Sequence, residues 1–532
     1  MTKDNQFLGN MYPACRRIIQ AETWQAIVDE LPQDFDPETF SAFLARRLSQ
    51  YNLPPYLPDL ADIEVLLHHL TVRQEPVNFH PDSLCVNPTL SLIKVGWQGL
   101  PSLIQQQGET QIEPKNGDEF ILIWREPREG EPVVQTATPD ELLALKIVVE
   151  SLDKRELARH ENTTQAALDR AIEYATARGV LLAPLSLITR DRSLFTADRE
   201  IPDKFLTAKV FTLQCHITQV CDLRCKHCYD RSNRSTLRLE DAVIVFDQLY
   251  DFCQSRHVYG QVSLSGGNPL LHPQFLDIYR AAVERGFMTA ILGNPTTSEI
   301  LAEIIDIQKP EFFQVSLEGM QQHNDYIRGT GFFDRVMRFL EDLKAAEIFS
   351  MVMLTLTRDN MAQVLPLAEL LRGKVDIFTF NRLSTVGEGA QLLTPGKKEY
   401  EAFLHAYLEA KEQNPAMGLK DSLINIIRCR EGTELFGGCA GFGCGAAFNF
   451  VALLPDGEVH ACRKFNSPIG NIHEQNLTEI YDSAKAASYR KGPSACRGCQ
   501  IRHVCGGCLA VIDSQGLDIT SDCDPCCFME RA

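Results

Sequence analysis

The segment FTLQCHIT (211–218) runs directly into QVCDLRCKHCYD (219–230), so a strand-like apolar stretch is followed at once by a cluster of cysteines. The three cysteines, spread over eight residues, are Cys221, Cys225 and Cys228. Three thiolates on one loop can hold three irons of a [4Fe–4S] cube and leave the fourth iron open to another ligand. The alternative is a zinc site that takes His227 or Cys215 as its fourth ligand. The spacing alone leaves both kinds of site open.

From about residue 205 the pattern alternates between strands and amphipathic helices. The six expected strands are FTLQCHIT (211–218), QVSLSGG (261–267), MTAILGN (288–294), FFQVSLEG (312–319), FSMVMLTLT (349–357) and DIFTFNRL (376–383). Helical segments such as 239–254 and 333–347 separate them. Six such units predict an α/β fold with a parallel sheet curled into a full or partial barrel. Ligands bind at the C-terminal ends of strands in such folds, where both the cysteine loop and SGGNP (265–269) fall.

Cysteine use divides the chain chemically. Of 18 cysteines, two precede residue 200, five lie between 215 and 253, and eleven lie between 429 and 527. In a reducing compartment such numbers indicate metal rather than disulfides. No apolar run approaches the roughly 20 residues of a membrane span, and MTKDNQFLGN lacks the apolar segment of a signal peptide. We therefore expect a cytoplasmic protein. The net charge of −18 argues against a nucleic-acid or membrane binder.

The first 200 residues are largely helical in pattern. DPETFSAFLARRLSQY (36–51) and DLADIEVLLHHL (59–70) predict helices, whereas DEFILIWRE (118–126) is strand-like. Three further helices are expected at 138–152, 154–161 and 163–179. VLLAPLSLI (180–188) follows as a possible small wing, so this part predicts a winged-helix module.

The cysteine loop has a recognisable context. Tyr229 follows the last cysteine and SGGNP follows the second strand, a combination that resembles the radical S-adenosylmethionine (SAM) superfamily. In that superfamily the amino and carboxylate groups of SAM chelate the open iron, and the glycine-rich turn exposes its backbone to the SAM ammonium. The usual turn is GGEP, and Asn268 here replaces the glutamate. The residues that the resemblance assigns to the cofactor are Tyr229, Gly266, Gly267, Asn268, Pro269, Asn294, Ser316 and Arg328.

The resemblance also implies the chemistry. Ser316 and Arg328 match the serine and arginine that reach the SAM carboxylate in peptide-modifying members, and Asn294 matches an asparagine that meets the cofactor. The cluster held by Cys221, Cys225 and Cys228 would pass one electron to SAM. The resulting 5′-deoxyadenosyl radical would remove a hydrogen from the substrate, while the protein sets the geometry.

The C-terminal cysteines resemble the SPASM extension of radical SAM enzymes, which holds two auxiliary [4Fe–4S] clusters. Carried over by position, the ligands of the first would be Cys439, Cys444, Cys462 and Cys508. Those of the second would be Cys496, Cys499, Cys505 and Cys527, with Cys526 and Cys523 as alternatives to the last. The whole chain would then hold SAM and three [4Fe–4S] clusters. Structural zinc sites are the alternative.

One position departs from the SPASM pattern. Members that oxidise a seryl or cysteinyl side chain carry an aspartate after the cysteine that matches Cys462, and Arg463 stands there in this chain. A sulfatase-maturing activity is therefore disfavoured, because its general base would be missing.

The N-terminal region, through LPPYLPDLADIEVLLHHL, VGWQGLPSLI and DEFILIWREPREGE, resembles the partner proteins that present precursor peptides to methanobactin-type maturases. Winged-helix elements of this kind bind leader peptides by adding a strand to a sheet edge. Residues 134–182 contain eight acids against six bases, which does not support a DNA-binding face. ACRKFNSPIGNI (461–472) and the chain length resemble maturases of selenobiotic, or thio(seleno)oxazole-type, peptides.

These observations predict a radical SAM/SPASM enzyme that modifies a ribosomally synthesised precursor peptide, forming a thioether, another cross-link or an oxidised cysteine-derived ring. Its partners would be the leader of that peptide and a ferredoxin or flavodoxin reductant. The expected domains are a helical partner-like domain (1–130), a winged-helix leader-recognition module (131–200), a partial (β/α)6 radical SAM barrel (205–390) and an irregular, cysteine-rich SPASM domain (391–532). One alternative is a SPASM enzyme acting on a small molecule or porphyrin precursor, and another is a non-catalytic iron–sulfur electron carrier or zinc scaffold.

Overall fold

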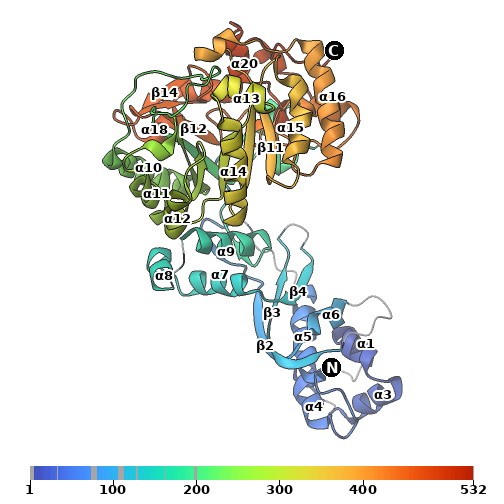
Figure 1. Cartoon of the computed structure of the whole chain (residues 1–532). Coiled ribbons are helices and arrows are strands. Elements are labelled where there is room, and N and C mark those ends of the chain that lie inside the picture. The colour runs from blue at the N-terminus through green and yellow to red at the C-terminus, as the bar shows by residue number, and fades with distance from the viewer. Residues whose placement is uncertain are drawn as a thin grey trace. The chain divides into compact units, whose positions relative to one another are not determined.

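The computed structural model describes residues 5–32, 34–72, 79, 81–105, 113–127, 130–161, 163, 165–196 and 200–530 (Figure 1). The chain divides into two compact units. The N-terminal unit comprises Met1–Thr163 and Ala167–Leu185, and the C-terminal unit comprises Thr164–Ala166 and Ser186–Ala532. Among the described residues, no helix is both long and apolar enough to cross a membrane.

The N-terminal unit begins with helices and continues into a small sheet. Its first helices are α1 (Asn5–Met11), α2 (Pro13–Ile18), α3 (Ala21–Glu30), α4 (Phe40–Arg47) and α5 (Leu57–Val72). An antiparallel sheet follows in the order β2 (Ser91–Gln98), β3 (Lys115–Arg125), β4 (Pro132–Thr136), with α6 (Leu100–Gln105) between its first two strands. Because successive side chains of a strand point to opposite faces, β3 serves two cores. Ile121 and Ile123 join the helical core, whereas Leu122 and Trp124 join a second core.

The second core lies under the three helices expected before residue 180. These are α7 (Pro139–Val149), α8 (Lys154–His160) and α9 (Gln165–Ala177). A capping box starts α7, because the Thr138 hydroxyl accepts from the Glu141 N–H while the Glu141 carboxylate accepts from the Thr138 N–H. The segment expected to form a wing contributes the short strand β5 (Leu181–Leu182), which pairs antiparallel with β1 (Cys85–Val86). The strand that pairs with β5 therefore lies far earlier in the sequence.

The C-terminal unit is built on one nine-stranded sheet. Six strands follow each other in sequence order and pair in parallel: β6 (Val210–Thr218), β7 (Tyr259–Gly266), β8 (Met288–Leu292), β9 (Phe312–Ser316), β10 (Ser350–Leu356) and β11 (Ile377–Arg382). All six strands expected from the sequence are therefore present. Their C-terminal ends share one edge of the sheet, and this edge carries the cysteine loop.

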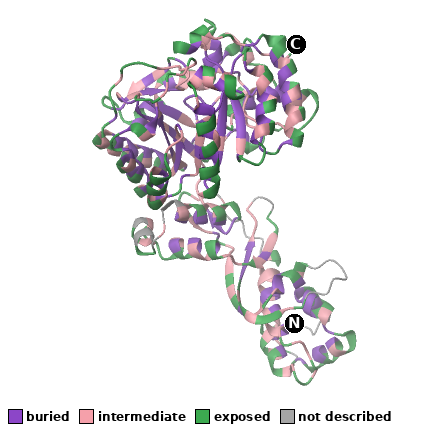
Figure 2. Ribbon diagram, viewed as in Figure 1, coloured by how far each residue is buried: buried purple, intermediate pink, exposed green. Residues whose placement is uncertain are grey.

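Helices separate these strands and cover the sheet. They are α10 (Leu239–Arg256), α11 (Phe275–Glu284), α12 (Ser298–Ile307), α13 (Gln321–Arg328), α14 (Phe332–Ala345) and α15 (Val364–Leu371). In α10, Ala242, Val245, Phe246 and Leu249 are buried at helical spacing. Figure 2 shows the strands buried and the outer faces of the helices exposed.

The C-terminal third is more regular than the sequence suggested. Its strands β12 (Phe450–Leu453), β13 (Glu458–His460) and β14 (Pro468–Asn471) extend the main sheet, because β12 pairs in parallel with β6. Its helices are α16 (Lys397–Gln413), α17 (Ile424–Arg430), α18 (Leu477–Asp482), α19 (Ala484–Lys491) and α20 (Leu509–Ser514). The stretch between β13 and β14 that contains Cys462 is thereby carried on the same sheet as the loop that contains Cys228.

Candidate functional site

The loop with the three expected cluster thiols connects β6 to α10, and two other segments and one of its own arginines hold its backbone. The Lys226 N–H donates to the Ile327 carbonyl at 3.0 Å, and the Glu388 N–H donates to the Cys228 carbonyl at 2.8 Å. Arg231 donates to the Cys225 carbonyl at 2.7 Å. Burial raises the pKa of the Cys225 thiol, so metal binding there must displace a proton.

The glycine-rich turn after β7 packs against the start of this loop. The Gly267 N–H donates to the Thr218 carbonyl and the Asn268 N–H donates to the Val220 carbonyl, both at 2.8 Å. A Cβ on Gly266 would lie 2.1 Å from the Thr218 oxygen, and one on Gly267 would lie 2.4 Å from the Val220 oxygen. The glycines therefore admit the backbone of the cysteine loop itself. Pro269 is buried at the start of the following turn.

The two expected asparagines meet beside Cys221. The Asn294 Nδ2 donates to Asp222 at 2.6 Å and lies 3.7 Å from the Cys221 sulfur. The Asn268 Nδ2 donates to the same carboxylate oxygen at 3.2 Å. Arg335 forms an ion pair with Asp222 at 3.3 Å. Asp222 was not expected from the sequence, although its place beside the first cysteine could have marked it.

Arg328 lies at the other side of the loop, 3.8 Å from the Cys225 sulfur. Its guanidinium forms an ion pair with Glu318 at 2.5 Å, and Glu318 also accepts from the Thr355 N–H at 2.8 Å. Burial would raise the pKa of Glu318, but the neighbouring basic groups outweigh it and the pKa is lowered. Ser316, the last residue of β9, lies two residues before this buried carboxylate. Glu318 is thus a site residue that the sequence analysis missed.

His227 was the histidine considered as a zinc ligand. Burial lowers its pKa to about 4, so the ring is neutral near pH 7, and its Nε2 lies 3.4 Å from Glu318. Among the described residues, no three His, Cys, Asp or Glu side chains converge closely enough to hold a single metal ion. A zinc site needs four donors about 2.3 Å or less from one point, whereas a cube takes each thiolate on a separate iron. The described residues therefore offer no closed zinc site at this loop.

The C-terminal thiols fall into two groups by their mutual electrostatic influence, and the first contains Cys439, Cys444, Cys462 and Cys508. Burial, together with the thiols of Cys508 and Cys439, raises the pKa of Cys444 to about 11. Burial, together with Cys444 and Cys508, raises the pKa of Cys462 to about 12. These thiols therefore lie close enough to influence one another electrostatically, and their role as ligands of one cluster stays a prediction.

The second group contains five thiols. Burial, together with Cys499, Cys527 and Cys523, raises the pKa of Cys496 to about 11. Cys527 also acts on Cys505, whose pKa is raised chiefly by burial. Cys526 instead faces Arg382 and Asp524. This arrangement favours Cys527 over Cys526 as the fourth ligand, and it leaves Cys523 within the group.

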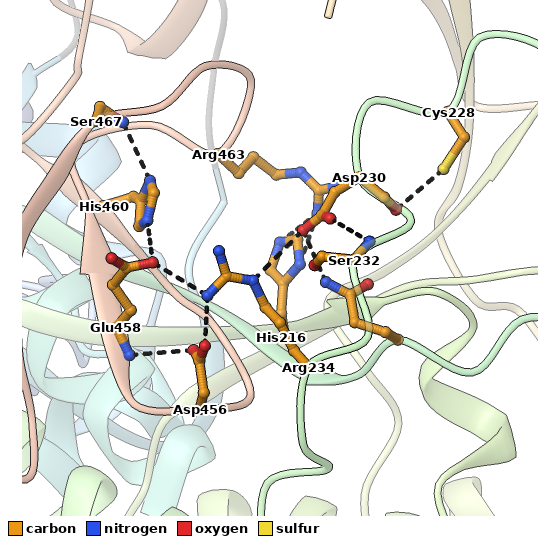
Figure 3. Close-up of polar contacts among 11 residues, drawn as sticks. His216, Cys228, Asp230, Ser232, Arg234, Asp456, Glu458, His460, Arg463 and Ser467 are labelled. Atoms are coloured by element: carbon orange, nitrogen blue, oxygen red, sulfur yellow. Dashed lines mark hydrogen bonds and ion pairs between the residues drawn. The ribbon is translucent and has the colours of Figure 1, made fainter. Parts of the chain in front are cut away.

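The expected aromatic residue, Tyr229, contacts the C-terminal third of the chain. The guanidinium carbon of Arg463 lies 3.7 Å from the centre of the Tyr229 ring. Arg463 also contacts the buried ring of His216 on β6 (Figure 3). Close by, Arg234 pairs with Asp456 and Glu458, which tie the cysteine loop to β13. None of these contacts was expected, because they join residues more than 200 positions apart.

Comparison with known proteins agrees with this geometry. Residues 215–371 match the Radical SAM superfamily, and residues 444–500 match SPASM, an iron-sulfur cluster-binding domain. The chain therefore contains a radical SAM domain and a SPASM domain, and it is an enzyme. Its radical SAM domain uses SAM and a [4Fe–4S] cluster, and the chain's loop of three thiols fits such a cluster.

Three curated relatives indicate the range of functions found nearby. An AdoMet-dependent heme synthase of Methanosarcina barkeri is 26% identical over 321 residues, which cover 55% of this chain and 89% of the relative. The mycofactocin maturase MftC of Mycobacterium tuberculosis is 26% identical over 337 residues, covering 59% and 82%. The subtilosin biosynthesis protein AlbA of Bacillus subtilis is 25% identical over 309 residues, covering 55% and 65%.

Among solved structures, Streptococcus suis SuiB bound to the precursor peptide SuiA is similar with a TM-score of 0.50 and 16% identity. The match covers 77% of this chain and 96% of SuiB. At this identity the likeness concerns the fold alone.

Proposed function

We propose that this enzyme modifies a ribosomally synthesised precursor peptide. The observation that carries the proposal is that one compact unit contains all three thiol groups, while the other compact unit contributes no thiol to them. Two of the relatives are named as a mycofactocin maturase and as a biosynthesis protein of the bacteriocin subtilosin, and SuiB, which is similar in fold, is bound to a precursor peptide. A cytoplasmic enzyme with a ferredoxin or flavodoxin as its electron donor fits the cysteine content.

The residues of the C-terminal unit would divide the work as follows. Cys221, Cys225 and Cys228 would hold the SAM-binding cluster, and Asn294 and Arg328 would orient its ligands. The bound cofactor supplies reductive cleavage of SAM and abstraction of a hydrogen atom from the substrate. The remaining cofactor-binding positions are Tyr229, Gly266, Gly267, Asn268, Pro269 and Ser316.

The two C-terminal thiol groups would hold auxiliary clusters, for a total of three [4Fe–4S] clusters. Their role would be to accept an electron or bind the substrate, because forming a cross-link or a ring removes electrons from the peptide. A thioether, another cross-link or an oxidised cysteine-derived ring would satisfy this balance. The selenobiotic type of peptide is the narrower proposal, supported by the segment 461–472.

The N-terminal unit would hold the leader of the peptide. We propose that residues 1–130 form a partner-like domain, which a winged-helix module (131–200) follows in the chain. Residues 205–390 would form a partial (β/α)6 barrel, which the SPASM domain (391–532) follows. Leu92 on β2 and Phe120 on β3 are 49% and 40% exposed. Since β2 is an edge strand, an added peptide strand could pair with its backbone and cover these side chains.

A small-molecule substrate is the second candidate, because the heme synthase relative is matched over 89% of its length. The test is anaerobic reconstitution, followed by incubation with SAM and either a cysteine-containing peptide encoded beside the gene or a heme precursor. We expect the peptide to lose two hydrogens by mass spectrometry and the heme precursor to stay unchanged. The reverse result would replace the peptide proposal with the heme-type activity.

Two sets of variants separate the parts of the proposal. Cys221→Ala should abolish SAM cleavage, and persistence of cleavage would contradict the assigned cluster loop. The double variant Leu92→Asp/Phe120→Asp should keep SAM cleavage and lose peptide modification. If both variants cleave no SAM while the reconstituted wild type also fails, the electron-carrier or zinc-scaffold alternative holds.

A further inference from the structure

Two consecutive cations, Arg463 and Lys464, lie between thiol groups assigned to different clusters. Cys462, directly before them, belongs to the first C-terminal group, and Tyr229, over which Arg463 stacks at 3.7 Å, directly follows Cys228. The pair therefore stands where the SPASM segment meets the SAM-cluster loop.

The charge of Arg463 has no carboxylate partner in the described part of the chain. Its Nη1 lies 3.0 Å from the His216 Nδ1. The pKa of His216 is lowered well below its usual value, mainly by burial and secondly by the charge of Arg463. The ring is thus a neutral acceptor. The guanidinium stays charged near neutral pH because an arginine side chain keeps its proton in proteins, and the Cys228 thiol is the group that interacts with this charge.

Two other buried arginines of this unit have carboxylate partners, whereas Arg190, like Arg463, has none in the described part of the chain. Arg328 is neutralised by Glu318, and Arg382 is neutralised by Asp421 and Asp524. Arg463 instead keeps its positive charge available to the sulfur of Cys228 and to whatever that sulfur binds.

Lys464 acts on the other group. It stands two residues after Cys462 and beside Arg382, whose guanidinium pairs with Asp524 at 2.6 Å. The Asp524 carboxylate accepts in turn from the Cys508 N–H at 2.9 Å. Its ammonium also donates to the Arg382 carbonyl at 3.4 Å. Neighbouring positions in one turn therefore present their charges to different thiol groups.

Reduction adds one electron, and hence one negative charge, to a [4Fe–4S] cluster. A fixed cation nearby stabilises the reduced form, because net charge and contacts to the sulfurs set the potential. We propose that Arg463 raises the reduction potential of the cluster on Cys221, Cys225 and Cys228, while Lys464 raises that of the cluster on Cys439, Cys444, Cys462 and Cys508. This inference rests on the cluster assignments of the proposed function. The electron comes from an external low-potential donor, dithionite in the test.

The test compares Arg463→Gln with Lys464→Gln in reconstituted protein, by mediated dithionite titration followed by EPR. The reduced signal that changes when SAM is added reports the SAM-binding cluster. Signals that remain in the Cys221→Ala/Cys225→Ala/Cys228→Ala background report the auxiliary clusters. We expect Arg463→Gln to make reduction of the first at least about tenfold less favourable, or about 59 mV for one electron, with the auxiliary signals unmoved. Lys464→Gln should make reduction of an auxiliary cluster less favourable and leave the signal of the SAM-binding cluster unmoved.

Arg463→Lys is the matched control, because it keeps the charge and loses the flat stacking surface over Tyr229. It should shift the potential less than Arg463→Gln does. Iron content and thermal unfolding establish that each variant is folded and loaded. Unchanged potentials in loaded Arg463→Gln, or a shift of the same cluster by both variants, would overturn the inference. Failure of the wild type to load iron or to cleave SAM would instead overturn the proposed function, and the inference with it.

Discussion

At Gly266 the backbone has φ +135°, and a methyl group would stand 2.1 Å from the Thr218 carbonyl oxygen. The obstacle is backbone at the end of β6, so it cannot swing aside as a side chain could. Gly266→Ala must therefore displace the turn or the cysteine loop. Strained backbone of this kind costs about 1–3 kcal/mol, so we expect SAM to bind roughly tenfold more weakly or worse.

Equilibrium dialysis of SAM against the reconstituted variant measures this effect. Gly396→Ala is the matched control, since its φ is −71° and the nearest atom to its Cβ would be Glu399 Oε2 at 3.6 Å. The control should bind SAM as the wild type does. Wild-type affinity in Gly266→Ala would show that the turn has no part in the SAM site.

Sequence reasoning could propose the cluster cysteines and Arg328 because they stand in recognisable local motifs. It missed Glu318, whose importance comes from burial beside Arg328 and from the Thr355 N–H, neither of which a sequence displays. It noticed Arg463 only as a missing aspartate. The stacking of this side chain on Tyr229 depends on the pairing of strands that lie more than 200 residues apart in the sequence.

At the scale of elements, Glu64 joins two helices of the N-terminal unit. This residue of α5 is buried, and its carboxylate accepts from the N–H groups of Ala14 and Cys15 in the first turn of α2. Such a carboxylate satisfies helix N–H groups that have no partner within the helix. Removing it in Glu64→Ala leaves both N–H groups buried, so we expect a loss of about 1–3 kcal/mol in the stability of this unit.

Tryptophan fluorescence during denaturation measures this loss selectively. All three tryptophans, Trp24, Trp97 and Trp124, belong to the N-terminal unit. Glu22→Ala, an exposed carboxylate in the first turn of α3, is the control and should change stability by at most about 0.5 kcal/mol. Equal effects of the two variants would contradict the bridging role of Glu64.

The parallel strands were predictable as elements because each is an apolar run bounded by helical patterns. The expected strand 211–218 corresponds to β6 (Val210–Thr218), and 376–383 corresponds to β11 (Ile377–Arg382). The short strand β12 was not predicted, because four apolar residues carry little periodic signal. Tertiary packing determines its pairing with β6 and the pairing of β5 with β1, and local propensity does not encode either.

At the scale of the whole molecule, the two units should depend differently on iron. The N-terminal unit has its own apolar cores, whereas eleven cysteines and long loops fill the last hundred or so residues of the C-terminal unit. Where metal organises loops, binding energy is folding energy. Removing iron with a chelator under reducing conditions should therefore destabilise the C-terminal unit by several kcal/mol and leave the N-terminal unit unchanged.

Two probes on the full chain separate these outcomes. Tryptophan fluorescence follows the N-terminal unit, and far-ultraviolet circular dichroism, after subtraction of that transition, follows the C-terminal unit. We expect the fluorescence midpoint in guanidinium to coincide for iron-loaded and iron-free protein, because no thiol group of the proposed clusters lies in that unit. The dichroism midpoint should fall on iron removal and recover on reconstitution. A fluorescence midpoint that falls in parallel would mean that the two units unfold as one cooperative body and that iron stabilises both together.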